Sequence, residues 1–599
     1  MDVLFVNNLN FSQTSVAGDL NIGIMNLATI LKESHFSVDL FLLANSIEQG
    51  LISLEDDYQS FSYRLVDLIL DYNAKVIGFT SMYDTYVFVI DLAEKIKRRD
   101  KDVKIVLGGP QPSITAEETM SAFDFIDMIA IGETESTIVQ IIDGLLNADA
   151  NSSRSLWDIP NIVFRQGDQW HVTRREPLCM DLALLPQIDD YFLSKFINKV
   201  EMYYVDVGRG CPYSCTFCCT NDFWHRKFRL KPTENILKEI RYVHEKYGIK
   251  VFSFQHDLFT ANKEKLLSFC DALRNSGLDI SWGCSSRADA LDDEVIEAMA
   301  RAHCRNVYLG IETGSDRMQR EIKKNLRLNE VIPKIKALHR SKIKVTCSFI
   351  YGLADEKVSD YKETLSLITD IIALNTSTIQ LHRWFPIVKT EEFGKISDKL
   401  YLDAGRINCQ LSEGRYLENC ISIIDSHKVL FGNFYEFDSE VRRMNINKMD
   451  VFITVLLTMH KFYKYIYDTL LSKYHNILDA YYHYLDLLYG ELDGIDIGDV
   501  ELNIRKEFSN KLNKIIAQIT EDLTSVDNMR LIRASYEFGK DIYDFDADKK
   551  CAEEFKDYPF NVILLYKNGR SMSHADAEEN IRVRFSKDNY GDLNFQRVL

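Results

Sequence analysis

Short apolar runs alternate with amphipathic segments over the first 150 residues of the chain. Apolar runs bounded by turn residues predict buried strands. Apolar positions three and four residues apart predict helices, and residues 21–35 show this spacing. Strands are expected at 2–8, 36–43, 74–81, 103–109 and 127–133. This alternation predicts an α/β fold with a doubly wound, Rossmann-like parallel sheet at residues 1–150.

Residues 200–400 repeat the alternation of strands and helices. Residues 201–210 lead into a cysteine-rich loop, a helix is expected at 231–248, and strands are expected at 250–260, 279–289, 306–315, 344–352 and 377–386. Units of this size predict a partial or full parallel barrel, whose reactive face lies at the carboxyl ends of its strands. Residues 151–199 form a connector between the two regions, and its alternation around Gly167 and Asp168 predicts a hairpin.

Residues 401–599 differ in composition and are rich in Tyr, Leu, Asp and Lys. The pattern over 459–492 predicts long helices, whereas 558–569 and 580–587 predict two strands. Tyrosines at helical spacing favour a core with hydroxyl groups at its edge over a wall on which a substrate stacks. We expect a mainly helical C-terminal domain that shapes the substrate pocket.

Composition and charge narrow the class of protein. The chain has 599 residues, enough for several domains, and a hydrophobic fraction of 46% that supports full cores. Its net charge of −18 argues against nucleic acid as the main partner, because phosphate binding requires a basic surface. The N-terminus lacks the pattern of a signal peptide, and the apolar stretch VFITVLLTM is too short to cross a bilayer. We expect a cytoplasmic protein without a membrane partner.

Three of the twelve cysteines form the run C-x-x-x-C-x-x-C, at Cys211, Cys215 and Cys218. Three thiolates on one short loop can hold three irons of a four-iron cluster and leave the fourth iron open. A zinc site is the alternative, but structural zinc normally takes four protein ligands. Cys219 supplies a fourth cysteine by count, although adjacent cysteines rarely reach one tetrahedral ion together.

The run GRGCPYSCTFCCT resembles the signature of the radical S-adenosylmethionine superfamily, C-x-x-x-C-x-aromatic-C. The resemblance implies that the three cysteines bind a four-iron four-sulfur cluster whose open iron chelates S-adenosylmethionine. It also implies that Phe217 lies near the adenine. Cys219 departs from the small or polar residue that is usual at its position.

The segments FTSMYDTY, LGGPQPS and IAIGETE follow predicted strands, where ligands of doubly wound sheets bind. In this order they resemble the cobalamin-binding domain that precedes the barrel in one large radical subfamily. Ordinary tight turns are the alternative explanation of their glycines. The D-x-H-x-x-G signature of histidine-ligated cobalamin proteins is missing, so no histidine is expected below the cobalt. The resemblance implies that the corrin or its nucleotide tail is bordered by Thr80, Ser81, Gly108, Gly109, Gly132 and Glu133.

Two later segments, LGIETGSDRMQREIKKN and FIYGLADEKVSDYKETL, resemble motifs of the same subfamily. This resemblance implies that Ser285, Arg287 and Glu312 contact the ribose or the methionyl part of S-adenosylmethionine. The segment FQHDLFT departs from the subfamily, because His256 stands where many relatives carry an acidic residue. WFPIVKT also lacks the Pro-Gly-Thr sequence of many relatives.

Together the resemblances imply a cobalamin-dependent radical S-adenosylmethionine enzyme that methylates an unactivated carbon of a peptide or small-molecule substrate. One S-adenosylmethionine methylates the cobalamin, and another yields the deoxyadenosyl radical that takes a hydrogen from the substrate. An electron donor such as flavodoxin or ferredoxin is implied. The alternatives are a non-methylating rearrangement, cyclisation or oxidation with the same cofactors, and a sensor or binding protein without turnover. The sequence assigns no catalytic side chain.

Overall fold

The computed structural model divides the chain into two compact units. One contains residues 1–364 and 376–445, and the other contains residues 365–375 and 446–599. The structure describes residues 1–7, 9, 21–54, 56–147, 156–176, 181–195, 197, 200–374, 377–403, 416–462, 464–492, 511–512, 514–516, 518–519 and 522–523.

The first sheet begins at the N-terminus of the chain. Its strands are β1 (Val3–Val6), β2 (Val38–Phe41), β3 (Val76–Thr80), β4 (Lys104–Gly108), β5 (Met128–Ala130), β6 (Ile162–Gln166) and β7 (Gln169–Val172). They are ordered β2-β1-β3-β4-β5-β6-β7, and the first five run parallel. The strand order reverses between β1 and β3, which places a ligand crevice at the carboxyl ends of these strands. The predicted doubly wound sheet is confirmed.

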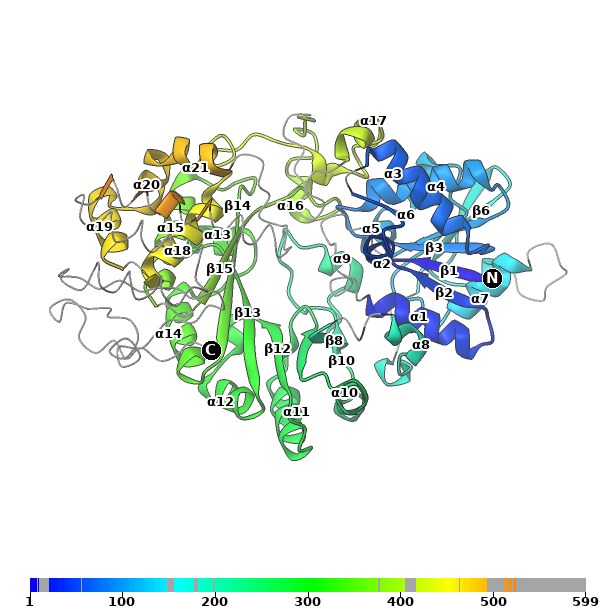
Figure 1. The fold of residues 1–599 in the computed structure, drawn as a ribbon, viewed down its shortest axis with the longest axis horizontal. Coiled ribbons are helices and arrows are strands. Elements are labelled where there is room, and N and C mark those ends of the chain that lie inside the picture. Colours follow the sequence, from blue (N-terminus) through cyan, green and yellow to red (C-terminus); the bar gives the residue numbers. More distant parts are fainter. Residues whose placement is uncertain are drawn as a thin grey trace, which may run out of the picture. The chain divides into compact units, whose positions relative to one another are not determined.

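Helices cover both faces of the first sheet. They are α1 (Ile22–Glu33), α2 (Leu43–Glu48), α3 (Tyr58–Leu70), α4 (Tyr86–Arg99), α5 (Pro110–Ile114), α6 (Ala116–Ala122) and α7 (Ile138–Leu146). Figure 1 shows α1 and α7 on one face and α3 and α4 on the other. Side-chain caps fix where two of them begin: Asn21 accepts from the N–H of Ile24, and Asp57 accepts from the N–H of Ser60. Because both faces are covered, the strands are apolar along most of their length.

The predicted hairpin around Gly167 and Asp168 is confirmed as β6 and β7, which pair antiparallel. Gly167 has a φ of +61°, a conformation that glycine adopts without steric cost. β6 also pairs antiparallel with β5, so the hairpin extends the first sheet. Arg165 fastens it to α6, since its guanidinium donates to the carbonyl oxygens of Met120 (2.7 Å) and Phe123 (2.9 Å).

The second sheet contains six parallel strands. They are β8 (Met202–Asp206), β11 (Val251–Gln255), β12 (Ser281–Ser286), β13 (Cys304–Glu312), β14 (Lys344–Tyr351) and β15 (Ser377–Arg383). Their order is β15-β14-β13-β12-β11-β8, so within the described residues β8 and β15 are open edges. Of the two predicted forms, the structure therefore has the partial barrel. A short antiparallel pair, β9 (Gly208–Arg209) and β10 (Arg229–Leu230), follows β8 in the chain.

Helices pack on the outer face of the second sheet. They are α10 (Thr233–Tyr247), α11 (Lys263–Asn275), α12 (Asp293–Arg301), α13 (Asp316–Glu321), α14 (Leu328–Arg340) and α15 (Val358–Ile372). The rings of Phe254 and Trp282 stack with centroids 4.8 Å apart, and Phe269 of α11 meets both rings edge-on. This aromatic cluster fixes which side of β11 and β12 faces outward, and therefore which side chains face the interior of the barrel.

Eight further helices have bounds in the described part of the chain. They are α8 (Asp190–Ser194), α9 (Thr220–Trp224), α16 (Glu391–Gly394), α17 (Ile421–Ser426), α18 (Met449–Phe462), α19 (Lys464–Tyr474), α20 (Ile477–His483) and α21 (Leu485–Leu492). The helical pattern predicted at 459–492 thus breaks into several helices. One break is at His475, which has a φ of +65°, and Asn476 then caps α20. The strands predicted at 558–569 and 580–587 lie outside the described residues.

Two observations bear on sequence expectations about the C-terminal region and membranes. Tyr481 is fully buried in the second unit, and its hydroxyl accepts from the N–H of Lys448 (3.3 Å). This tyrosine fits the expected core with hydroxyl groups at its edge. No helix in the part of the chain that the structure describes is long and apolar enough to span a membrane.

Glu356 closes the loop that follows β14. Its Oε2 accepts from the backbone N–H groups of Gly352 and Leu353. Arg442 binds the same loop from the other side, because its Nε donates to the carbonyl oxygen of Gly352 (2.7 Å). Glu356 is 2% exposed, and burial raises its pKa to about 8 in spite of the two backbone hydrogen bonds.

We expect Glu356 to make stability depend on pH. Its folded pKa lies above the value of about 4.3 for an unfolded glutamate, so between these values the folded state binds the extra proton. The free energy of unfolding then falls as pH rises from about 5 to 8, by at most about 1.4 kcal/mol per pH unit from this group. Glu356→Gln should remove this slope in urea unfolding measured across that range. A wild-type-to-variant difference that does not change with pH would contradict the raised pKa.

Candidate active site

The three cysteines lie on the loop between β9 and α9. Gly210 begins the turn with a φ of +83°, and a Cβ there would lie 2.1 Å from the carbonyl oxygen of Lys227, so only glycine fits. Thr216 anchors the middle of the loop: its N–H donates to the carbonyl oxygen of Ile322 (3.1 Å), and its hydroxyl donates to Glu392 (3.1 Å). The loop is therefore held by the C-terminal end of α13 and by α16.

The thiols of Cys211, Cys215 and Cys218 lie within electrostatic reach of one another. Burial raises the pKa of each, and the charge of another cysteine of the set raises it further. Lys324 and Arg287 oppose this rise at Cys215. Within the described residues, no group of three metal-binding side chains converges on one ion. A cubane cluster does not need such convergence, because each cysteine binds a separate iron.

Arg287 follows β12 and lies beside the cysteine loop. Its guanidinium stacks on the ring of Tyr213 at 3.8 Å and donates to Asp289 and to the carbonyl oxygen of Lys324 (2.7 Å). Its side chain is 5% exposed, yet Nη1 has no acceptor among the described residues. A buried cationic donor without an acceptor costs free energy, and this site therefore suits an anionic ligand group such as a carboxylate.

Glu312 ends β13 in a left-handed conformation, with a φ of +71°. Such a conformation costs about 1–3 kcal/mol for a residue other than glycine and often marks a functional site. Its Oε1 accepts from the buried Lys324 Nζ (2.9 Å). The register of β13 against β14 also shifts between Gly310 and Glu312. The strain turns the Glu312 side chain toward Lys324, which also neighbours Cys215.

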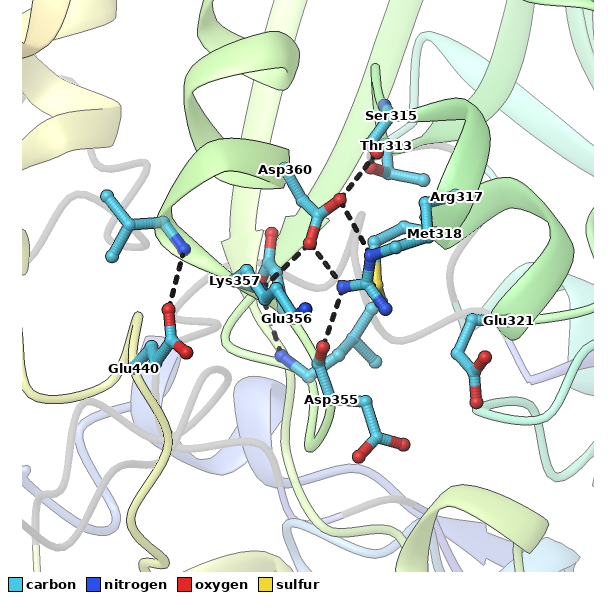
Figure 2. A network of polar contacts seen from close by, with 12 residues as sticks. Thr313, Ser315, Arg317, Met318, Glu321, Asp355, Glu356, Lys357, Asp360 and Glu440 are labelled. Atoms are coloured by element: carbon cyan, nitrogen blue, oxygen red, sulfur yellow. Dashed lines mark hydrogen bonds and ion pairs between the residues drawn. The ribbon is translucent and has the colours of Figure 1, made fainter.

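The loop after Glu312 is anchored to α15 (Figure 2). Asp360 accepts from the Ser315 hydroxyl (2.6 Å), from the Arg317 guanidinium and from the N–H of Lys357 (2.9 Å). Burial raises the pKa of Asp360, but these donors outweigh it and leave that pKa below its usual value. The carboxylate of Asp360, in the segment FIYGLADEKVSDYKETL, thus fixes the segment LGIETGSDRMQREIKKN.

A cavity of about 1140 Å³ lies between the carboxyl ends of the first sheet and the inner face of the second. Seven of the residues expected to bind cofactors line it: Thr80, Ser81, Gly108, Gly109, Gly132, Glu133 and Ser285. A Cβ on Gly108 would meet no atom closer than 3.9 Å, so its absence leaves open backbone surface. A Cβ on Gly109 would lie 2.8 Å from the Thr80 hydroxyl. These loops form a shallow, small-residue surface that fits a large flat cofactor.

The remaining predicted residues form a second group around the cysteine loop. The described lining of the cavity does not include Phe217, Arg287, Glu312 or the three cysteines. Asp257 joins the two groups, because it lines the cavity and raises the pKa of Cys211 and Cys218. Phe217 is half-buried and packs against the apolar core.

The sequence left the role of His256 open, and in the structure both of its ring nitrogens face backbone groups. Its Nδ1 accepts from the N–H of Leu258 (2.8 Å), and its Nε2 lies 3.3 Å from the carbonyl oxygen of Arg229. Burial lowers its pKa to about 4, so the ring is neutral and donates through Nε2. We therefore assign His256 to fixing the loop between β11 and α11.

Models of two protein families match the two sheets. Residues 14–142 match the B12 binding domain, and residues 205–368 match the Radical SAM superfamily. The chain contains a B12 binding domain followed by a radical S-adenosylmethionine domain. The cofactors of these domains are cobalamin, S-adenosylmethionine and a four-iron four-sulfur cluster, as the sequence implied.

The chain is similar to several known proteins. It is 28% identical to an uncharacterized methyltransferase of Pyrococcus horikoshii over 57% of this chain and 72% of that protein. It is 23% identical to the anaerobic magnesium-protoporphyrin IX monomethyl ester cyclase of Synechocystis sp. over 52% of this chain and 62% of that protein. Among solved structures, the radical S-adenosylmethionine methyltransferase TsrM of Kitasatospora setae, with tryptophan substrate and aza-SAM bound, has a TM-score of 0.59. It is 14% identical and covers 77% of this chain and 90% of TsrM. At this level of identity, the likeness shows that the two proteins share a fold.

The sequence did not reveal a buried charge network that links the B12 binding domain to the radical domain. Arg209 donates to Glu133 (2.9 Å) and Glu135 (2.6 Å), which follow β5, and to Asp206 (3.2 Å). Arg229 donates to both oxygens of Glu133 (2.7 and 2.8 Å). We call these five residues the inter-sheet network. The prediction for Glu133 concerned cobalamin, and the structure shows its carboxylate bound by two arginines.

The inter-sheet network has a strong electrostatic basis. The side chains of Arg209 and Glu133 are 9% and 4% exposed, so water screens their attraction only weakly. Burial lowers the pKa of Arg209, but the charges of Glu135 and Asp206 outweigh this and raise it, which keeps the guanidinium charged. Arg209 lies two residues before Cys211. The network therefore connects the loop after β5 in one domain to the cysteine loop of the other.

We expect Glu133→Gln to destabilise the protein, because it leaves the buried Arg209 and the partly exposed Arg229 short of an acceptor charge. Breaking a buried ion pair typically costs about 3–5 kcal/mol. Glu118→Gln is the matched control, since Glu118 pairs with Lys389 between the same two domains but is partly exposed. Exposed pairs contribute at most about 1 kcal/mol. Denaturant unfolding of the full chain measures both changes, and equal effects of the two substitutions would contradict the role given to the network.

Proposed function

We propose that the protein transfers a methyl group from S-adenosylmethionine to an unactivated carbon of its substrate. The observation that carries the proposal is the cavity of about 1140 Å³, which residues of both domains line. Transfer between a cofactor on one domain and a substrate on the other requires both in one enclosed space with aligned atoms. The similarity to an uncharacterized methyltransferase and to TsrM supports methylation over other outcomes.

When bound, the cofactors supply hydrogen abstraction from the substrate and the methyl group that replaces the hydrogen. The residues of the chain bind and orient these groups. Cys211, Cys215 and Cys218 hold the cluster, and Arg287 offers its buried Nη1 to the carboxylate of S-adenosylmethionine. Lys324 and Glu312 form an ion pair near Cys215.

On the B12 binding domain, Thr80, Ser81, Gly108, Gly109 and Gly132 border the corrin or its tail. Small residues let the backbone approach a large ligand closely. The only histidine among the described lining residues is His256, whose ring nitrogens face backbone groups. No histidine is therefore proposed as a cobalt ligand.

The proposal includes two features of the cellular setting. Cleavage of S-adenosylmethionine consumes one electron, which a donor such as flavodoxin or ferredoxin supplies. The substrate is a peptide or a small molecule. A cluster held by thiolates requires a reducing compartment, and we infer the cytoplasm.

A second candidate function is a ring closure or oxidation without methyl transfer. The similarity to the magnesium-protoporphyrin cyclase of Synechocystis sp. favours it. The two functions use the same cofactors, and they differ in whether the methyl group of S-adenosylmethionine appears in the product.

We expect methyl-labelled S-adenosylmethionine to label the product. The holoenzyme, reduced and incubated with a small-molecule and peptide extract of the source cells, should form a labelled product one methylene heavier than its precursor. Deoxyadenosine and S-adenosylhomocysteine should both accumulate. Cys218→Ala should abolish all three signals, whereas Cys219→Ala, the matched control, should keep them. An unlabelled product formed with deoxyadenosine but without S-adenosylhomocysteine would favour the second candidate function.

A further inference from the structure

The inner face of the second sheet is polar, in contrast to an ordinary parallel barrel. Barrel interiors are usually filled with Val, Ile and Leu. Along β11 the buried residues Phe252 and Phe254 alternate with Ser253, which is half-buried, and Gln255, which is exposed. Along β12 the buried Trp282 and Cys284 alternate with half-buried Ser281, Gly283 and Ser285. The apolar residues face the helices, so the inner face is left to polar and small residues.

Strand register arranges these inner residues in rows across adjacent strands. The middle row is Tyr204, Ser253, Gly283 and Asn306, each paired in register with the next. The row toward the amino ends is Met202, Val251 and Ser281. The row toward the carboxyl ends contains Asp206, Gln255, Ser285 and Tyr308. All of these residues line the shared cavity.

The rows are nearly free of charge. Asp206 is neutralised by Arg209 in the inter-sheet network, and Arg305 lies at the amino end of β13, outside the three rows. The other members are hydroxyl, amide, glycine and apolar side chains. Each hydroxyl and amide can donate and accept hydrogen bonds. The three rows match a ligand with many neutral donors and acceptors, and the charged residues Arg305 and Asp257 line the same cavity outside the rows.

The spacing of the rows matches an extended chain. Neighbouring rows are two residues apart along a strand, which is about 6.6 Å at the strand rise of roughly 3.3 Å per residue. Residues i and i+2 of an extended peptide have the same separation. Gly283 leaves the middle row without a side chain, because a Cβ there would lie 3.1 Å from the carbonyl oxygen of Asn306 on the neighbouring strand.

The residue types also match those that recognise polypeptides. Tyr, Ser, Gly and Asn predominate in antibody binding loops, because tyrosine gives rigid contact area and the small polar residues give adaptable hydrogen bonds. The middle row consists of Tyr204, Ser253, Gly283 and Asn306.

We propose that the inner face of β8, β11, β12 and β13 binds an uncharged polypeptide segment in extended conformation. This inference names the substrate class of the proposed function. It rests on that function, because the proposed function is what makes this ligand the substrate. The segment lies along the strands, with its residues against successive rows and one end toward Asp257 and the cysteine loop. Its amide groups bond Ser253, Asn306 and Gln255, and Tyr204 and Tyr308 contact its side chains.

The test uses the full-length holoenzyme and a pool of random heptapeptides with blocked termini. Half of the pool contains only uncharged residues, and half contains Asp, Glu, Lys or Arg at alternate positions. Peptides that remain bound after size-exclusion separation are counted by mass spectrometry. We expect at least a tenfold enrichment of uncharged peptides, and its loss in Ser253→Phe and Ser253→Asp. Thr378→Phe is the matched control, because Thr378 is an exposed strand residue outside the described cavity lining, and it should keep the enrichment.

Several outcomes would overturn the inference. These are no enrichment, equal enrichment of charged peptides, or enrichment that survives both Ser253 substitutions. Cobalamin absorbance and cluster absorbance of each variant report whether it is folded and loaded. Peptide binding is measured without turnover, so a failure of methyl transfer would leave this result standing and would count only against the proposed function.

Discussion

The bonds of Arg209 to Glu133 and Glu135 are the interaction on which the site depends. A cavity between two domains keeps its dimensions only if the domains keep their separation. Five charged side chains, two cationic and three anionic, meet where the loop after β5 reaches the start of the cysteine loop. Buried charges impose strict geometry, because a small displacement leaves them without partners and without water. The network therefore holds the loop after β5 against the start of the cysteine loop, and so fixes the spacing of the two domains at this point.

The polar inner face of the second sheet is the other unusual feature. An apolar interior would have stabilised the barrel by packing and closed it. Here the aromatic residues Phe254, Phe269 and Trp282 are placed on the outer side, where they anchor helices. Stability thus comes from the helix layer, and the interior is left open to a ligand. The carboxyl ends of the same strands carry Arg287 and Glu312, which face the cysteine loop.

Much of the fold could be predicted from the sequence, because short apolar runs and their turns are local signals. The strands that end at Thr80, Gly108 and Ala130 coincide with apolar runs, and their small-residue loops do line the cavity. The alternation of apolar and polar residues in VFSFQ and SWGCSS can also be read from the sequence. It indicates strands whose two faces differ in polarity. The pairing of Arg209 with Glu133 was not predictable, since residues 76 positions apart leave no local pattern. The commitment of His256 to backbone groups likewise depends on the position of Arg229, from a separate strand.

The most direct test of the account is the magnetic interaction between the two metal centres. In the holoenzyme with cobalamin as cob(II)alamin and the cluster reduced, both centres carry an unpaired electron. If one cavity joins the two domains, electron paramagnetic resonance should show dipolar broadening or faster relaxation of the cobalt signal when the cluster is reduced. The broadening should weaken in Glu133→Gln, which loosens the inter-sheet network. A cobalt signal that is the same with the oxidised and the reduced cluster would contradict the shared cavity.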